Sequence, residues 1–299
     1  MVNTTSAWTL REGFAFCAAI AAVGLLLQLC AGPIDWQRFA WPANGVVLAI
    51  LLMLITGMHL LRRRIPAFRF LATYEAAVPA LLLTVALTIV MGLTRQQADG
   101  RWFSNMLTFW PFVLAYTYVV LMLGLTILKR LHRILHPSAA PPSWRRDVPF
   151  LLNHAGLFVA LVAATLGSAD MQRLRMIATK DVPEQRAFDE QRRVVTLPMT
   201  IRLRQFILEE YDDGSPRRFA SDIHVVTRSG KHVEATVDVN HPVKTDGWKI
   251  YQYGYDTARG AESQISIFEL VRDPWLPYVY AGIYMMLAGA VFMLIGTKP

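Results

Sequence analysis

The stretch Gly13–Ala31 reads GFAFCAAIAAVGLLLQLCA and holds no charged residue. An α-helix needs about 20 apolar residues to cross the ~30 Å hydrocarbon core of a bilayer, so this stretch is long enough for one span. Five more apolar runs follow, at 43–61, 71–93, 107–128, 148–168 and 275–296. The sequence therefore predicts a membrane α-helical fold with about six transmembrane helices, the first retained rather than cleaved as a signal peptide.

Composition agrees with this class, since 54% of the residues are hydrophobic, 17% are charged and the mean hydropathy is +0.33. The net charge of +8 comes largely from cations beside the apolar runs, which indicates membrane orientation rather than a nucleic-acid partner. The loops after the second and fourth runs carry Arg62, Arg63, Arg64, Arg69, Lys129, Arg130, Arg133, Arg145 and Arg146. We therefore expect a multi-pass protein of the bacterial inner membrane, in contact with the lipid bilayer, with both termini cytoplasmic and residues 169–274 extracytoplasmic (periplasmic).

The pattern divides the chain into five parts. We expect a four-helix transmembrane region at 1–136, a cytoplasmic proline-rich connector at 137–149, a histidine-bearing transmembrane helix at 150–168, the extracytoplasmic segment at 169–274 and a last transmembrane helix at 275–299.

The segment 169–274 is polar and reads as a small antiparallel β-rich domain before the last helix. Its first stretch, 171–180, has helical spacing, whereas Ile201 and Leu203 alternate with arginines as in a half-buried strand. Two strands, 222–226 and 232–239, flank Ser229-Gly230, which predicts a hairpin. Further strands are expected at 248–255 and 264–271.

His154 is the strongest candidate functional residue. It lies six residues past Val148, about 9 Å into the hydrocarbon at 1.5 Å per residue. An intramembrane ionisable side chain is costly without a partner and marks a functional site by default. An imidazole at this depth suits a metal or haem axial ligand, a proton relay, or a hydrogen bond to a neighbouring helix.

The other histidines favour ordinary surface or interfacial roles. His132 and His136 have i, i+4 spacing, but no carboxylate or cysteine completes a ligand set, so a solvated loop is expected. His224 and His232 flank the predicted hairpin turn and are expected to be able to face each other across it. The chain has no C-x-x-C pair, which excludes a dithiol redox site and a c-type haem attachment site.

The most specific pattern lies near the C-terminus, in three elements: V-x-V-N-x-P, G-x-x-I-Y-Q-x-G-Y and D-P before the last apolar run. Their residues are Val237, Val239, Asn240, Pro242, Gly247, Ile250, Tyr251, Gln252, Gly254, Tyr255, Asp273 and Pro274. Together with His154 and the glycines after it, this pattern resembles the ResB (CcsB) family of system II cytochrome c biogenesis proteins, over about residues 150–296.

The resemblance implies a subunit that handles and exports haem across the membrane for thioether attachment to apocytochrome c. It implies haem b as a transient cargo, His154 as a candidate axial ligand, and a CcsA-like haem-handling membrane protein as partner. We expect the partner to supply the second ligand, no metal beyond the haem iron, and no catalysis by this chain alone; no catalytic residue is assigned.

Two points stay open at this stage. The residues Asn240, Pro242, Tyr251, Gln252, Gly254, Tyr255, Asp273 and Pro274 are expected either to brace the domain or to form a docking surface. The alternative functions are a membrane anchor for a respiratory complex, with a permanent b-type haem and normally two facing histidines, and a haem-free scaffold.

Overall fold

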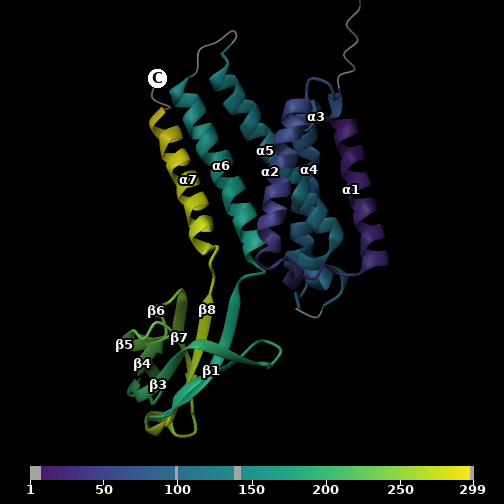
Figure 1. The fold of residues 1–299 in the computed structure, drawn as a ribbon. Coiled ribbons are helices and arrows are strands. Elements are labelled where there is room, and N and C mark those ends of the chain that lie inside the picture. Colours follow the sequence, from purple (N-terminus) through teal and green to yellow (C-terminus); the bar gives the residue numbers. More distant parts are fainter. Residues whose placement is uncertain (1–7, 98–99, 138–142, 297–299) are drawn as a thin grey trace, which may run out of the picture. The chain divides into compact units, whose positions relative to one another are not determined.

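The computed structural model describes residues 8–97, 100–137 and 143–296. It divides the chain into two compact units, one of residues 1–169 with 275–299 and one of residues 170–274 (Figure 1). The first unit is helical, and the second is built from β-strands.

Six long apolar helices form the first unit. They are α1 (Leu10–Ala31), α2 (Ala43–Leu61), α4 (Tyr74–Leu93), α5 (Trp110–Leu135), α6 (Trp144–Gly167) and α7 (Leu276–Gly296). Within the described residues, six helices are long and apolar enough to cross a membrane, with the 3₁₀ segment Trp102–Thr108 merged into the span of α5. A multi-pass membrane protein with six spans, as predicted, is therefore confirmed. A short helix, α3 (Pro66–Phe70), connects α2 to α4, and a 3₁₀ turn (Trp36–Phe39) precedes α2.

Helix α5 is central to this unit, because it contacts α1, α2, α4 and α6. The approach of α1 to α4 and α5 requires glycine. A Cβ at Gly13 would lie 2.1 Å from the carbonyl oxygen of Glu75, and one at Gly24 would lie 2.6 Å from Cα of Pro111. Helix α6 follows α5 in the chain, and α7 packs side by side with α6 (Figure 1).

Two helix boundaries differ from the expected ones. Helix α5 continues seven residues past 128, so His132 lies on a helix rather than in a loop. Of the expected connector 137–149, residues 138–142 lie outside the described residues, and 144–149 form the first turns of α6. Both extensions are polar helical turns, which hydropathy alone does not include in a span.

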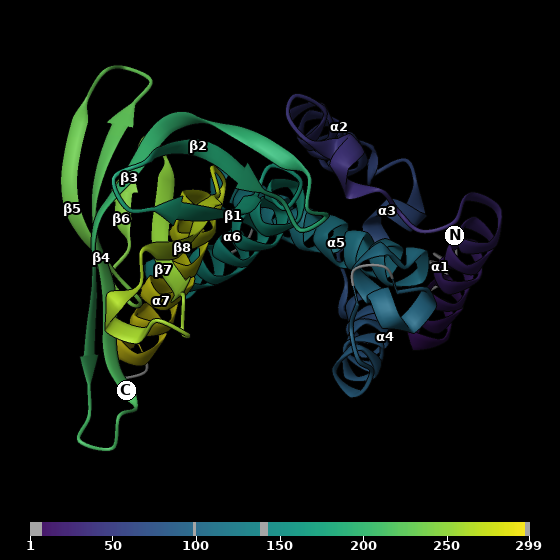
Figure 2. The ribbon, with the colours of Figure 1, turned by 90° about the horizontal axis from the view of Figure 1, so that it is seen from below.

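The second unit is one antiparallel sheet of eight strands, in the order β5-β4-β3-β2-β1-β8-β7-β6. The strands are β1 (Gln172–Thr179), β2 (Pro183–Phe188), β3 (Val194–Glu210), β4 (Pro216–Thr227), β5 (His232–Asp238), β6 (Val243–Thr245), β7 (Trp248–Tyr255) and β8 (Ile265–Arg272). The sheet is strongly curved (Figure 2). Although three strands separate β4 from β8, Ser221 and Ser266 on these strands meet with their hydroxyl oxygens 2.6 Å apart.

The curved sheet encloses one hydrophobic core. Its fully buried members include Met176, Ile201, Ile223, Ile250 and Phe268, which come from five strands. Alternation places them there: along β3, Ile201 and Leu203 point inward, and Arg202 and Arg204 point out, as predicted. This confirms the antiparallel β-rich domain before the last helix.

The predicted helical stretch 171–180 is wrong. It forms β1, whose eight residues pair with β8 in unbroken register from Gln172↔Arg272 to Thr179↔Ile265. Leu174, Met176 and Ala178 alternate inward with a period of two. The same stretch also satisfies i, i+3 spacing, and pairing with a strand distant in sequence decides between the two patterns.

The other predicted strands are confirmed. β4 and β5 form the hairpin around Ser229-Gly230, where Gly230 has φ +81°. β7 covers the expected range 248–255, and β8 lies one residue later than the expected 264–271.

Candidate functional site

His154 lies on α6, half-buried, with its imidazole fixed by its own helix. Its Nδ1 lies 2.8 Å from the carbonyl oxygen of Phe150, one turn earlier. The rings of Phe150 and His154 stack with centroids 3.9 Å apart. Because a carbonyl oxygen can only accept, Nδ1 carries the proton, and the lone pair of the neutral imidazole is on Nε2.

A buried ion pair lies at the start of the same helix. Arg130 of α5 contacts the carboxylate of Asp147 in the first turn of α6, and the two side chains are 12% and 10% exposed. The second carboxylate oxygen of Asp147 accepts from the backbone N–H of Ser143 at 2.7 Å. This pair joins α5 to α6 in an enclosed place, where removing either charge would leave the other uncompensated.

The ion pair and the histidine are connected through one aromatic ring. The guanidinium carbon of Arg130 lies 4.7 Å from the centroid of the Phe150 ring, within cation–π range. The same ring stacks on His154. Asp147 therefore positions Arg130, Arg130 positions Phe150, and Phe150 contacts the imidazole by both its ring and its carbonyl group.

The stripe of α6 that bears His154 faces α5. Helical spacing puts Asp147, Phe158 and Thr165 on this stripe. At its far end, Thr165 donates to the hydroxyl of Tyr116 on α5 at 2.9 Å, and that hydroxyl donates to the carbonyl oxygen of Leu161. The imidazole is thus held on the side of α6 that packs on the N-terminal helices.

The opposite side of α6 is closed by α7 through glycines. A Cβ at Gly156 would lie 2.6 Å from the carbonyl oxygen of Gly282, and one at Gly282 would lie 2.5 Å from that of Gly156. A Cβ at Gly289 would lie 2.8 Å from the side chain of Asn153. Small residues allow this backbone approach, so α6 and α7 form a tight pair behind the histidine.

Five of the six other histidines lie in two groups, one of His59, His132 and His136 and one of His224 and His232. His132 stacks near His136, with ring centroids 4.6 Å apart, and lies 5.6 Å from His59. His224 and His232 are joined by a 3.0 Å hydrogen bond across the β4–β5 hairpin, as their positions suggested. Among the residues that the structure describes, no group of three or more His, Cys, Asp or Glu side chains could hold a metal ion.

Four residues in or next to the C-terminal sequence pattern lie in turns of the β-domain. Asn240 and Pro242 lie in the turn between β5 and β6. In the β6–β7 turn, Asp246 has φ +45° and Gly247 has φ +79°. Positive φ at both central residues is the geometry of a tight hairpin turn, which explains the glycine in the pattern.

The central part of the pattern surrounds a β-bulge in β7. The register against β8 shifts between Gln252 and Gly254, and the Gln252 side chain donates to the carbonyl oxygen of Gly254 at 2.9 Å. Tyr255 stacks on Phe206, with centroids 4.7 Å apart. Tyr251 pairs in register with Glu269. Asp273 and Pro274 connect the end of β8 to the segment before α7.

One part of this site is not evident from sequence. Arg130 and Asp147 both lie beside apolar runs, where membrane orientation alone accounts for cations, so the sequence gives no reason to pair them. The available signal is the lone acidic residue, Asp147, at the start of an apolar run next to two exposed arginines.

Comparison with known proteins finds a sequence family and a relative that are similar to part of this chain. Residues 143–265, which contain α6 and strands β1 to β7, match the ResB-like family. The cytochrome c biogenesis protein CcsB of Gloeobacter violaceus is 31% identical over 106 residues. That match covers 34% of this chain and 22%, about a fifth, of the relative's length.

The solved structure of the cytochrome c haem lyase CcmF matches with a TM-score of 0.38 at 15% identity, over 84% of this chain and 45% of that one. The ResB-like match agrees with the resemblance found in the sequence: residues 143–265, which carry His154 and most of the β-domain, are similar to that family.

Proposed function

We propose that this protein acts in cytochrome c biogenesis, and that His154 is an axial ligand to a haem b that it holds in transit. Haem in this proposal is cargo rather than a resident cofactor. The relative that is 31% identical over 106 residues is a cytochrome c biogenesis protein. The residues around His154 are the local support for extending that role to this chain.

The observation that carries the proposal is the orientation of the imidazole. Nδ1–H donates to the carbonyl oxygen of Phe150 at 2.8 Å, so in the neutral ring the lone pair that an iron ligand requires is on Nε2. Histidine ligands in proteins are oriented in this way by a hydrogen bond from the second ring nitrogen.

The surroundings suit an apolar macrocycle. Phe150 stacks on one side of the imidazole, and Leu157, on the following turn of α6, is exposed. The helix pair α6–α7 supports this surface from behind through Gly156 and Gly282. A rigid, mostly apolar surface with one free nitrogen binds a flat iron macrocycle at a single axial position.

One ligand from this chain implies a second from elsewhere. We propose that a CcsA-like haem-handling membrane protein supplies it, and that apocytochrome c receives the haem by thioether attachment on the outer face of the bacterial inner membrane. In this orientation the termini are cytoplasmic and the β-domain is extracytoplasmic. Tyr251 and the turn at Asn240 and Pro242 are then available for docking, since Gln252 and Tyr255 are engaged within the domain.

The test is an absorption spectrum of the detergent-purified protein, co-expressed with a CcsA-like partner, for wild type and His154→Ala. We expect a Soret band in the wild type, its loss or weakening in His154→Ala, and its recovery with added imidazole. His136→Ala is the matched control, because His136 lies at the exposed end of α5, and its spectrum should equal that of the wild type.

Other outcomes lead to the alternative functions. A band that survives purification without a partner, with two histidine ligands by spectroscopy, would indicate a permanent b-type cytochrome. A wild-type complex without haem, with c-type cytochromes made normally in cells that carry His154→Ala, would refute the proposal and favour a haem-free scaffold.

A further inference from the structure

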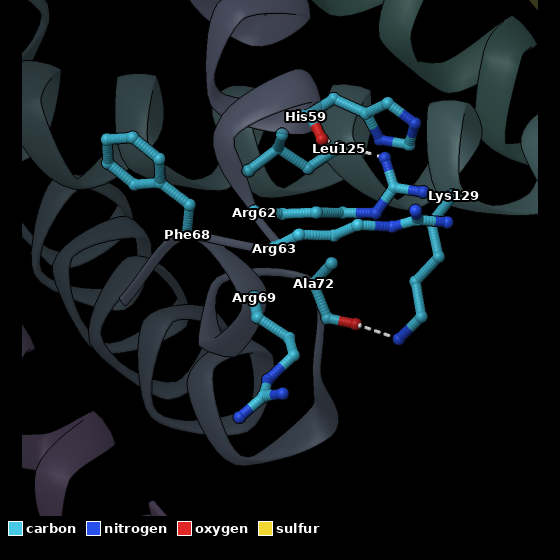
Figure 3. A pocket seen from close by; sticks show the side chains of 8 residues that line it. All are labelled: His59, Arg62, Arg63, Phe68, Arg69, Ala72, Leu125 and Lys129. Carbon is cyan, nitrogen blue, oxygen red and sulfur yellow. Dashed lines mark hydrogen bonds between the residues drawn. The ribbon is translucent and has the colours of Figure 1, made fainter. Parts of the chain in front are cut away.

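A basic cavity lies at one end of the helical unit, among α2, α3 and α5. It has a volume of about 310 Å³, within the range of small-ligand sites. Four cationic side chains line it: Arg62, Arg63, Arg69 and Lys129. Figure 3 shows Arg62 and Arg63 extending in the same direction, toward Lys129. No carboxylate lines the cavity.

Two of these cations are held in place by backbone oxygens. Lys129 donates to the carbonyl oxygen of Ala72 at 2.8 Å, and Arg62 donates to that of His59 at 2.7 Å (Figure 3). These carbonyl groups orient the cations without neutralising them. The carboxylate of Glu75 is close enough to interact with Lys129 but does not line the cavity. Both cations keep further N–H donors, because an ammonium carries three and a guanidinium five.

Membrane orientation explains that this end of the bundle is basic, but it does not explain why side chains from three elements line one hollow. Like charges in one cavity repel, and an oxyanion among them would remove that repulsion and accept several charge-assisted hydrogen bonds. His59 also lines the cavity, and the rest of the wall is apolar, from Phe68, Ala72 and Leu125. The ligand chemistry is therefore a phosphate or carboxylate joined to an apolar body.

We propose that this cavity binds the phosphodiester headgroup of an anionic phospholipid. The cavity lies at the ends of α2 and α5, which are long enough to span the membrane, so it opens where lipid headgroups lie. Basic pockets between transmembrane helices bind such headgroups in general. This inference does not depend on haem handling, since none of the lining residues belongs to the His154 site.

The experiment is native mass spectrometry of the full chain in detergent, titrated with phosphatidylglycerol and, separately, with phosphatidylcholine. The variant is Arg63→Gln with Arg69→Gln, because both side chains are exposed and neither donates a hydrogen bond within the described residues. The control is Arg145→Gln with Arg146→Gln, two exposed arginines at the start of α6 that make the same change in net charge.

We expect the cavity variant to bind phosphatidylglycerol about 25-fold more weakly, at about fivefold for each arginine near a headgroup. The control variant should stay within twofold of wild type, and phosphatidylcholine binding should not change. Equal weakening in both variants would overturn the proposal in favour of diffuse surface charge.

Two competition arms distinguish other anions. Displacement of phosphatidylglycerol by millimolar inorganic phosphate would assign the cavity to a free phosphate and overturn the lipid assignment. Displacement by stoichiometric haem, lost in Arg63→Gln with Arg69→Gln, would assign it to propionate groups, with the same consequence. Retention of the lipid in both arms is the expected result.

Discussion

The buried pair between Arg130 and Asp147 gives the sharpest test of how the His154 site is held. Asp147→Ala removes the carboxylate and leaves the guanidinium in a site where its side chain is 12% exposed. The Nε of Arg130 already lacks a hydrogen-bond partner among the described residues. Removing the Asp147 carboxylate would therefore add to the buried donors of Arg130 that have no acceptor. Breaking one member of a buried ion pair costs about 3–5 kcal/mol, which shifts the folding equilibrium more than a hundredfold.

The assay is reversible unfolding of the purified chain in mixed micelles, followed by circular dichroism, for a complete double-mutant cycle. Besides Asp147→Ala, it includes the single variants Arg130→Met and Asp147→Leu and the double variant Arg130→Met with Asp147→Leu, which together close the cycle. Replacing both charges with apolar side chains of similar size should leave the free energy of unfolding within about 1.5 kcal/mol of wild type. The coupling energy then isolates the pair from its separate contacts.

Two results would refute this reasoning. If Asp147→Ala changes the free energy of unfolding by less than about 0.5 kcal/mol, the pair is solvated as a surface ion pair is. If the double variant is as unstable as Asp147→Ala, the loss comes from packing or from the hydrogen bond that the Ser143 N–H donates to Asp147, rather than from an uncompensated charge.

Three further predictions concern packing, backbone and pH. Gly156→Ala should lower the free energy of unfolding in micelles by about 1–3 kcal/mol, because its Cβ would lie 2.6 Å from a backbone oxygen of α7; Gly57→Ala, with open space around it, should not. Gly247→Ala should destabilise the β-domain by about 1 kcal/mol in urea titrations, because φ there is +79°. Hydrogen bonds from the Arg186 guanidinium and backbone lower the pKa of Glu184 from 4.5 to about 2, so its contribution is present above pH 4.5 and is lost as pH falls toward 2. Solvent screening reduces it to about 1 kcal/mol, and Glu184→Gln should flatten the acid side of the stability profile by that amount.

Hydropathy and the spacing of apolar residues were sufficient to predict the helices and strands whose surroundings are uniform along their length. Each long helix meets an apolar surround along most of its length, so its sequence shows it directly. β3 alternates from Leu197 to Arg204 and β4 from Ser221 to Thr227, because there one face of the sheet is core and the other is more exposed. In both cases the local pattern and the tertiary environment require the same spacing.

The prediction errors lie where contacts with residues distant in sequence decide the secondary structure. Residues 171–180 satisfy helical spacing and alternation equally, and only pairing with β8, about 90 residues later, selects the strand. The extension of α5 to Leu135 has the same origin, since Arg130 on the added turns is fixed by Asp147 of the next helix. A hydropathy scale ends the helix at the first cation and cannot register a counter-ion across a loop.

The site shows the same division. His154 is conspicuous from sequence alone, because an imidazole in an apolar run requires a reason. Its hydrogen bond to Phe150 follows from i, i+4 geometry, yet the choice of ring nitrogen does not. The residues around Gln252 and Gly254 can be recognised as a sequence pattern. That they form a β-bulge closed by a hydrogen bond from the Gln252 side chain is known only from the register of β7 against β8.

The double variant that tests the ion pair also separates positioning from binding at His154. If Arg130 only steadies the Phe150 ring, removing both charges forfeits a partly buried cation–π contact of about 1 kcal/mol, and haem affinity falls about fivefold. The Soret band should keep its position, because the carbonyl group that fixes Nδ1 belongs to the helix backbone and stays in place. A stably folded double variant that loses the band as completely as His154→Ala would mean that Arg130 contacts the cargo itself, and the role of a positioning residue would have to be abandoned.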